Sequence, residues 1–225
     1  MRIAIAIPAF DAAPSVGDIA ARAKPFASDL LVVDDGSRDA TADAARAAGA
    51  RVIRHARNLG KGRALRTAFD DLFGRGADAV VTVDADGQHL PEQIPVLLAA
   101  AGDADLVLGM RDHLFSQMSR VRRTSNRLSS RAISLIVGAR IPDVQTGFRL
   151  YTRRLLAATG FPEPRFEAES AVLVRAVRRG FRVVGVPVAL GYADGRCGSH
   201  YRALRDSVRI AAAIASARLG DGRPS

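Results

Sequence analysis

The sequence predicts an α/β fold: a mainly parallel sheet flanked by helices, in a single domain. Short apolar runs rich in Val and Ile alternate with Ala-rich helical stretches in the first half of the chain. This alternation is typical of parallel strands joined by right-handed helical crossovers. The length of 225 residues suits one domain with a substantial core. Since no repeat, linker or low-complexity tract interrupts the chain, we expect residues 1–225 to form one unit.

Turn residues bound each of the apolar runs in this half. Pro91 suits the first turn of a helix, where its missing N–H costs nothing. In chain order, the expected elements are strand 3–7, helix 15–23, strand 30–33, helix 40–48, strand 51–54, helix 62–73, strand 79–83, helix 92–101 and strand 106–108.

The second half is richer in basic helical patterns. Residues 114–138 interleave Arg with Ser, Leu and Ile, which indicates an amphipathic helix or a pair of helices. Residues 166–179 suit a helix and residues 181–188 an extended segment. A basic amphipathic helix is expected over residues 201–219, before a frayed tail.

Charge is unevenly distributed along the chain, whose formal net charge is +10. Residues 1–110 contain 12 Lys/Arg and 15 Asp/Glu, whereas residues 111–225 contain 21 and 8. A basic half attracts an anionic partner: phosphates, an anionic membrane face or nucleic acid. Nucleic acid would leave the acidic strand ends described below unexplained, and few aromatic residues are present to stack on bases, so we expect no nucleic-acid partner.

Cysteine usage and hydropathy bear on the compartment. The single cysteine, Cys197, excludes an internal disulfide framework and fits a reducing environment. Residues 1–10 lack the apolar core and cleavage site of a signal peptide, and no apolar run approaches the roughly 18 residues that span a bilayer. We therefore expect a cytoplasmic protein whose contact with the inner face of the cell membrane is peripheral.

Two carboxylates follow the expected strand 79–83 directly. Asp84 and Asp86 are one residue apart, and an extended strand would place both side chains on the same face. They could then converge on a hard divalent cation, Mg²⁺ or Mn²⁺, with Gln88 or His89 completing or orienting the shell. The alternative is an acidic turn after a buried strand, because Asp and Gly are common turn residues.

A second acidic strand end lies upstream, where the run 30–33 leads into Asp34, Asp35 and Gly36. In open α/β sheets, ligands bind outside the carboxyl ends of the strands, where loops from neighbouring strands meet. The two acidic loops are therefore predicted to share one pocket.

Several segments occur together in the order of a known family. The ordered set resembles the family 2 glycosyltransferases of the GT-A fold, nearest to the dolichyl-phosphate or polyprenyl-phosphate sugar synthases. Residues 195–210 are also similar to the closing segment of that subgroup. The segments are VVDDGSRDAT (32–41), NLGKGRALRTAF (58–69), DADGQHLPEQI (84–94), DVQTGFRLY (143–151) and FEAE (166–169).

The resemblance covers nearly the whole chain and implies an enzyme, a hexosyltransferase. It implies a GT-A domain in which residues 1–110 form a nucleotide-sugar-binding half and residues 111–220 an acceptor-binding half. A nucleotide-sugar donor and a polyprenyl-phosphate acceptor are the implied partners.

On the donor side, the resemblance implies that Asp34 and Asp35 bind the base and ribose, with Lys61 nearby. It also implies that Asp84, Asp86 and Gln88 organise the metal and the diphosphate. Charge supports these roles, because carboxylates accept from base N–H and ribose hydroxyl groups and a lysine offsets phosphate charge.

The first-strand motif departs from the family. Pro8 and Phe10 belong to a stretch that usually reads Pro-x-Tyr-Asn-Glu, whereas this chain has Pro-Ala-Phe-Asp-Ala. The change removes one expected polar contact near the base or ribose, and Phe10 lacks a hydroxyl. The altered motif therefore bears on which nucleotide-sugar donor the protein would bind.

On the acceptor side, Asp143, Gly147 and Arg149 match the family's Asp-x-x-Thr-Gly-Phe-Arg stretch, which lies beside the acceptor and the transferred sugar. A guanidinium suits a phosphate oxygen, so Arg149 and Arg123 are expected to contact the acceptor phosphate or the leaving diphosphate. Further acceptor-side candidates are Glu167, Ser199 and His200.

The expected reaction is inverting transfer of a hexose from a UDP- or GDP-sugar, in one in-line displacement assisted by a divalent cation. A polyprenyl phosphate is already ionised near neutral pH, so positioning and charge stabilisation suffice. A hydroxyl acceptor would need a base, for which Asp143, Glu167 and Glu169 are candidates.

Other classes of protein remain as alternatives. A catalytically degenerate nucleotide-sugar-binding protein would share these motifs. A sugar-phosphate nucleotidyltransferase is disfavoured, because it would want a Gly-rich loop directly after the first strand and this chain has none there.

Overall fold

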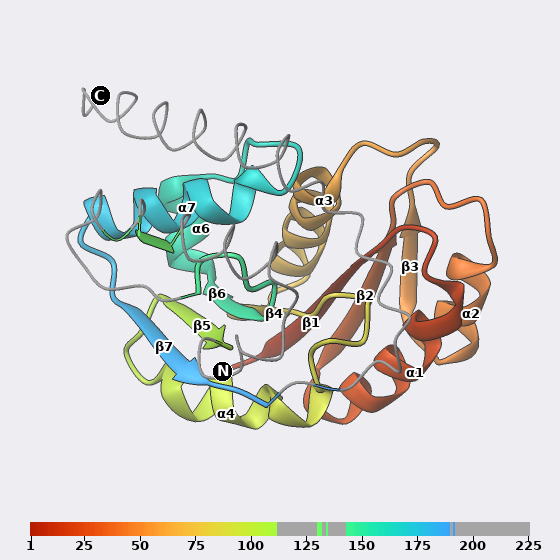
Figure 1. Ribbon diagram of the computed structural model, residues 1–225, viewed down its shortest axis with the longest axis horizontal. Helices are drawn as coiled ribbons and strands as arrows, with labels where there is room; N and C mark the ends of the chain where they lie inside the picture. The colour runs from red at the N-terminus through yellow and green to blue at the C-terminus, as the bar shows by residue number, and fades with distance from the viewer. Residues whose placement is uncertain (112–129, 132–133, 135–142, 190, 192–225) are drawn as a thin grey trace.

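The structure is a computed structural model that describes residues 1–111, 130–131, 134, 143–189 and 191. A seven-stranded sheet forms its centre, with helices on both faces (Figure 1). The strands are β1 (Ile3–Ala9), β2 (Asp29–Asp34), β3 (Arg51–Arg54), β4 (Ala79–Thr82), β5 (Leu106–Met110), β6 (Arg149–Thr152) and β7 (Val183–Pro187). The helices are α1 (Ala13–Ala23), α2 (Thr41–Ala47), α3 (Lys61–Gly74), α4 (Ile94–Ala101), α6 (Arg153–Thr159) and α7 (Glu167–Arg178), with 3₁₀ turns η1 (Lys24–Phe26) and η2 (Pro91–Gln93).

The strand order is β3-β2-β1-β4-β6-β5-β7. Strands β3, β2, β1 and β4 are parallel, whereas β6 is antiparallel to both of its neighbours, β4 and β5. The carboxyl ends of β1, β2 and β4 therefore lie at one edge of the sheet, and the register pairs Ala9 with Asp34 there. Both acidic loops start from this edge.

Hydrophobic residues fill a core on each face of the sheet. Successive β1 residues alternate between the cores, because strand side chains point to opposite faces: Ala4 and Ala6 join one, Ile5 and Ile7 the other. The first core packs against α3, α6 and α7, and the second against α1, α2 and α4 (Figure 1). Burying one Ile side chain contributes roughly 1.5–3 kcal/mol, so these layers hold the loop-bearing edge in place.

The expected elements of the first half are confirmed to within a few residues, and β3 matches its predicted range. The strand expected over 79–83 ends at Thr82, and the helix expected over 92–101 begins with the 3₁₀ turn η2. In the second half, α7 and β7 lie where a helix and an extended segment were expected.

Two elements were not predicted, β6 and α6. β6 has only four residues, and α6 follows it without a linker, its first turn capped by the Thr152 hydroxyl, which accepts from the Leu155 N–H. The helices expected over 114–138 and 201–219 lie outside the described residues. Within the described part of the chain, no helix is long and apolar enough to cross a membrane.

Candidate active site

The acidic loop after β4 carries Asp84 and Asp86. Both residues follow the strand, since β4 ends at Thr82 and Asp86 lies in a turn completed by Gly87 at a φ of 76°. The expectation that an extended strand puts the side chains of Asp84 and Asp86 on the same face is therefore wrong, because neither residue belongs to β4. Both are partly exposed, and the Asp86 carboxylate accepts from the Gln88 N–H at 3.0 Å, a local bond typical of an Asx-turn.

The two carboxylates influence each other electrostatically. Burial, together with the negative charge of Asp84, raises the pKa of Asp86 above its usual value. Burial alone would also raise the pKa of Asp84, but Lys61 and other nearby positive charges lower it to about 2. The loop therefore holds one carboxylate whose ionised form is stabilised by nearby cations beside a second whose ionised form is destabilised by burial and by its neighbour.

Lys61, the first residue of α3, pairs with two carboxylates. Its Nζ lies 2.7 Å from Asp84 Oδ1 and 2.9 Å from Glu169 Oε2, and its side chain is 14% exposed. Burial would lower the pKa of Lys61, but these two charges outweigh it and raise the pKa above its usual value. Lys61 therefore joins the β4 loop to the start of α7.

Glycines make these approaches possible. A Cβ at Gly147 would overlap the Asp84 carboxylate, so the loop before β6 leaves the space in which Asp84 lies. Gly60, at a φ of 104°, and Gly62 flank Lys61, and a Cβ on either would overlap the backbone of residues 163–165. The N-terminus of α3 is thereby fixed against that segment, where the Arg63 N–H donates to the Pro164 carbonyl at 3.0 Å.

Arg111, directly after β5, is a second cation of the site. Its Nε donates to Asp143 Oδ2 at 2.8 Å and its Nη2 to Asp143 Oδ1 at 3.2 Å. Asp143 is fully buried and is held by this bidentate pair. The charge of Arg111 lowers the pKa of both Asp84 and Asp86, so the guanidinium lies within electrostatic reach of the acidic loop.

His89 lies beneath the acidic loop, 1% exposed and stacked on Phe148 with ring centroids 5.4 Å apart. Neither ring nitrogen has a hydrogen-bond partner among the described residues, and Nδ1 is 3.8 Å from Asp84 Oδ2. Burial, followed by the positive charge of Arg111, lowers the pKa of His89 to about 3, so the ring is neutral near pH 7.

Arg149 occupies a different position from the one expected. Its guanidinium is fully buried and donates to the backbone carbonyls of Thr146, Val144 and Glu169 at 2.6–2.7 Å. In this structure Arg149 thus ties the loop before β6 to α7 and presents no exposed surface to a ligand.

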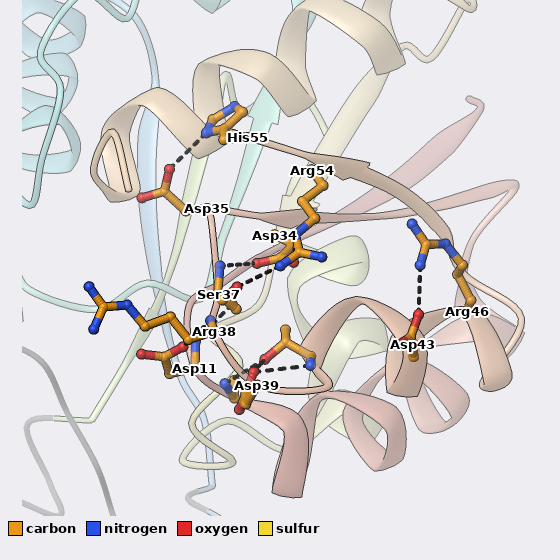
Figure 2. A network of polar contacts seen from close by, with 12 residues as sticks. Asp11, Asp34, Asp35, Ser37, Arg38, Asp39, Asp43, Arg46, Arg54 and His55 are labelled. Atoms are coloured by element: carbon orange, nitrogen blue, oxygen red, sulfur yellow. Dashed lines mark hydrogen bonds and ion pairs between the residues drawn. The ribbon is translucent and has the colours of Figure 1, made fainter. Parts of the chain in front are cut away.

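Asp34 ends β2 and Asp35 follows it, at the second acidic strand end, and both are buried. Asp34 Oδ1 accepts from the Ser37 N–H at 2.8 Å, and its Oδ2 lies 3.1 Å from Arg54 Nε (Figure 2). Asp35 contacts His55 Nδ1 at 2.7 Å and accepts from the backbone N–H groups of Leu59 and Gly60. Asp34 therefore joins the loop after β2 to β3, and Asp35 braces the loop after β3.

The altered first-strand motif joins the same network. Pro8 and Phe10 are partly exposed at the end of β1. Asp11 takes a φ of 47°; its N–H donates to Ser37 Oγ at 2.9 Å, and its Oδ1 accepts from the Arg38 N–H at 2.8 Å (Figure 2). The loops after β1 and β2 are bound together by these contacts.

Glu167 and Glu169 open α7, and both are largely buried. One oxygen of each, Glu167 Oε2 and Glu169 Oε1, has no hydrogen-bond partner among the described residues. Of the other predicted acceptor residues, Arg123, Ser199 and His200 lie outside the described part of the chain.

Sequence reasoning missed three features of the site. Arg111 carried no motif signal beyond its position after a strand, at the edge where ligands bind. The buried state of His89 and the two-carboxylate pairing of Lys61 depend on residues brought from α7 and β6, which are distant in sequence.

The acidic loop fits a divalent cation, although the described residues contain no group of three or more His, Cys, Asp or Glu side chains arranged to hold a metal. Mg²⁺ typically binds one or two carboxylates together with substrate phosphates. Asp84 and Asp86 supply two hard oxygen ligands, and a divalent cation would offset both the burial and the negative charge of Asp84, which together raise the pKa of Asp86.

Fold and site place the chain in the GT-A class of α/β domains. Over its whole length it superimposes on a crystal structure of glucosyl-3-phosphoglycerate synthase from Mycobacterium tuberculosis in complex with Mn²⁺, UDP and phosphoglyceric acid, with a TM-score of 0.77 over 80% of that chain. At 22% identity this likeness shows a shared fold.

The sequence comparisons define the family. The family described as "Glycosyl transferase family 2" matches residues 4–160, and the chain belongs to it. The chain is 35% identical over 173 residues to an undecaprenyl-phosphate mannosyltransferase of Micrococcus luteus, which covers 72% of this chain and 71% of that protein. It is 33% identical over 160 residues to a dolichyl-phosphate hexose transferase of Haloferax volcanii, covering 70% and 68%. The resemblance noted from the motifs is thus confirmed, and the protein is a glycosyltransferase.

Proposed function

We propose that this glycosyltransferase moves a hexose from a UDP- or GDP-sugar to a polyprenyl phosphate, with inversion and with the aid of Mg²⁺ or Mn²⁺. The observation that carries the proposal is the Asp84–Asp86 pair at the carboxyl edge of the sheet, with Lys61 and Arg111 beside it. The names of two similar proteins, an undecaprenyl-phosphate mannosyltransferase and a dolichyl-phosphate hexose transferase, support the lipid acceptor.

The charges of the site suit the departure of a nucleoside diphosphate. A divalent cation bound by Asp84, Asp86 and Gln88 would neutralise charge that develops on the leaving diphosphate. Lys61 and Arg111 add two positive charges near the same loop, and each is paired with a carboxylate. Positive charges already present at this edge would stabilise the negative charge that develops on the leaving group.

The surroundings of two of the three candidate bases, Asp143 and Glu169, favour an acceptor that is already ionised. Asp143 is bound by Arg111, and one oxygen of Glu169 is paired with Lys61. These carboxylate oxygens already contact cations, so they are less available to accept a proton from an acceptor hydroxyl. A phosphate oxygen needs no base near pH 7, so the enzyme would act by positioning the two substrates.

Phosphate contacts are assigned to Arg111 and Arg123 in this proposal. Arg149, with its three backbone partners, is proposed to position Glu169 and the loop that carries Gly147. Gly147, Glu167, Ser199 and His200 remain proposed acceptor-side residues.

The donor's base and ribose are proposed to lie against the loops after β1 and β2. Pro8 and Phe10 lie where the first of these loops leaves β1, and Asp34 and Asp35 lie where the second leaves β2. The contacts of Asp11 with Ser37 and Arg38 join the two loops (Figure 2).

Product extraction tests the reaction. Radiolabelled UDP- and GDP-hexoses are incubated with polyprenyl phosphate, with Mn²⁺ or with EDTA, and the lipid is extracted. We expect label in the lipid phase only with metal and one of the donors, and loss of transfer in Asp86→Asn. Asp70→Asn is the matched control, since this exposed carboxylate on α3 pairs only weakly, at 3.8 Å, with Arg66.

The possible outcomes separate the candidate functions. Label transferred to a water-soluble product would replace the lipid acceptor by a hydroxyl acceptor. Donor-dependent thermal stabilisation without transfer to either phase would indicate a nucleotide-sugar-binding protein without activity. Transfer that persists in EDTA would refute the metal dependence.

A further inference from the structure

The ammonium group of Lys61 is paired with Asp84, the carboxylate that the divalent cation would need as a ligand. Its Nζ is 2.7 Å from Asp84 Oδ1. An ammonium and a divalent cation sharing one carboxylate would repel each other strongly in this partly buried place, where charges are weakly screened. Full binding of the cation through Asp84 therefore requires Lys61 to move away from that oxygen.

A second carboxylate already contacts the ammonium group of Lys61. Glu169 Oε2 is 2.9 Å from Nζ, and Glu169 Oε1 has no hydrogen-bond partner among the described residues. The backbone of Glu169 is fixed by Arg149, whose Nη1 donates to its carbonyl at 2.6 Å. Lys61 can thus leave Asp84 and still keep a full charge partner.

Only the side chain of Lys61 is free to make this change. Gly60 and Gly62 seat the start of α3 against residues 163–165, and Arg175 holds that segment through Glu163 at 2.5 Å. The lysine side chain has four rotatable bonds and a compact charge. A small rotation can therefore move Nζ away from Asp84 and toward Glu169.

We propose that Lys61 is an exchangeable counter-ion of Asp84: it neutralises this carboxylate before the divalent cation binds, and shifts to Glu169 when the cation arrives. This inference rests on the proposed function, because it takes Asp84 to be a ligand of that cation. Lys61 is here a positioning residue that sets the affinity of the site for metal.

The exchange couples metal binding to donor binding. The cation releases an ammonium group at the edge where the donor's diphosphate would lie, and the diphosphate is a strong partner for it. Each ligand therefore strengthens the binding of the other by the same factor. Without donor, the wild-type site is expected to bind metal weakly.

Mn²⁺ titration followed by electron paramagnetic resonance of the free ion tests the exchange without measuring activity. Lys61→Met removes the competing charge and keeps the side-chain length. It is expected to bind Mn²⁺ on the order of tenfold more tightly than the wild type in the absence of donor. Arg66→Met removes one positive charge from the same helix, away from the loop, and should leave the affinity unchanged.

Glu169→Gln independently tests the role of Glu169 as the second carboxylate partner of Lys61. Losing this charge binds Lys61 more firmly to Asp84, so Mn²⁺ affinity should fall. In the Lys61→Met background the same substitution should have little effect, because Glu169 acts through Lys61. This double-mutant cycle separates the proposed exchange from direct binding of metal by Glu169, which would lower the affinity in both backgrounds.

Equal or weaker Mn²⁺ binding by folded Lys61→Met, as judged by circular dichroism, would overturn the exchange and make Lys61 a simple support for Asp84. Should Lys61→Met not fold, an unchanged or raised affinity in Glu169→Gln would overturn it instead. If the wild type binds Mn²⁺ and Asp84→Asn does not, the proposed metal site is supported even where one of these two results overturns the exchange. Absence of Mn²⁺ binding in every variant, with or without UDP, would count against both.

Discussion

Gly147 determines where the Asp84 carboxylate can lie. The hydrogen atom of this glycine faces the carboxylate, and the backbone that carries it is held by Arg149. A short side chain such as Asp has little room to adjust to an added methyl group, because only two torsions separate its carboxylate from the backbone.

Gly147→Ala should therefore displace Asp84 and weaken metal binding. Contacts that orient a ligand commonly change metal affinity by about 10–100-fold, and we expect a Mn²⁺ dissociation constant raised by about tenfold or more, with a parallel loss of transfer. Gly74→Ala is the control, because no atom lies within 4 Å of its added Cβ on α3. The control should keep full Mn²⁺ affinity and gain about 0.4–1 kcal/mol of stability; equal Mn²⁺ affinity in the two variants would contradict the steric account.

Which site residues could be predicted from the sequence depends on how local their signal is. Asp84 and Asp86 follow a strand, and their place at the ligand-binding edge comes from that position alone. The environment of each residue is a long-range property. Arg149 matched a motif, yet at the start of β6 its buried guanidinium is engaged by backbone carbonyls of the preceding loop and of α7.

At the scale of elements, ion pairs protect the sheet edge formed by β3. Arg51 on β3 joins Asp29 on β2 and Asp71 on α3, and Arg75 reaches Asp29 at 3.2 Å. Charged side chains on an edge strand oppose pairing with another chain. Burial alone would raise the pKa of Asp29, but Arg51 and Arg75 together lower it below its usual value.

This lowered pKa gives the edge a pH dependence. Because the folded pKa of Asp29 lies below the unfolded one, its contribution to stability is fully present above about pH 4 and is lost as the pH falls through the folded pKa. Asp29→Asn should cost about 1–2 kcal/mol in urea unfolding at pH 7, and the gap from wild type should narrow progressively as the pH is lowered below about 4. Asp43→Asn, which removes an exposed pair on α2, should cost little at either pH. A gap of constant size across this range would refute the assignment.

The parallel part of the sheet could be predicted because each βα unit repeats a local pattern, and β1 to β4 appear at the expected positions. β6 could not, because a four-residue antiparallel strand gives no periodicity of its own. Its place between β4 and β5 is set by long-range pairing, with Val81 and Val107 both opposite Leu150.

At the scale of the whole molecule, the uneven charge suits a protein that meets an anionic surface. Residues 111–225 contain 21 Lys/Arg and 8 Asp/Glu, and each basic residue near an anionic leaflet contributes about 1 kcal/mol. We expect sedimentation with vesicles containing anionic lipid at low salt, and release when the salt rises from about 0.05 to about 0.5 M. Vesicles of phosphatidylcholine alone are the control. Equal binding to both kinds of vesicle, independent of salt, would show that charge does not drive the contact.

Because β6 lies between β4 and β5, the two stretches proposed as donor and acceptor halves share one sheet. Of the strands in the structure, β5 pairs only with β6 and β7, both of which are synthesised later. During translation, the first 111 residues would present β5 without a neighbour and β4 with one bare edge, which invites aggregation. Folding of the donor side is therefore expected to wait for residues 149–152 to leave the ribosome, and a fragment comprising residues 1–111 should be insoluble where the full chain is not.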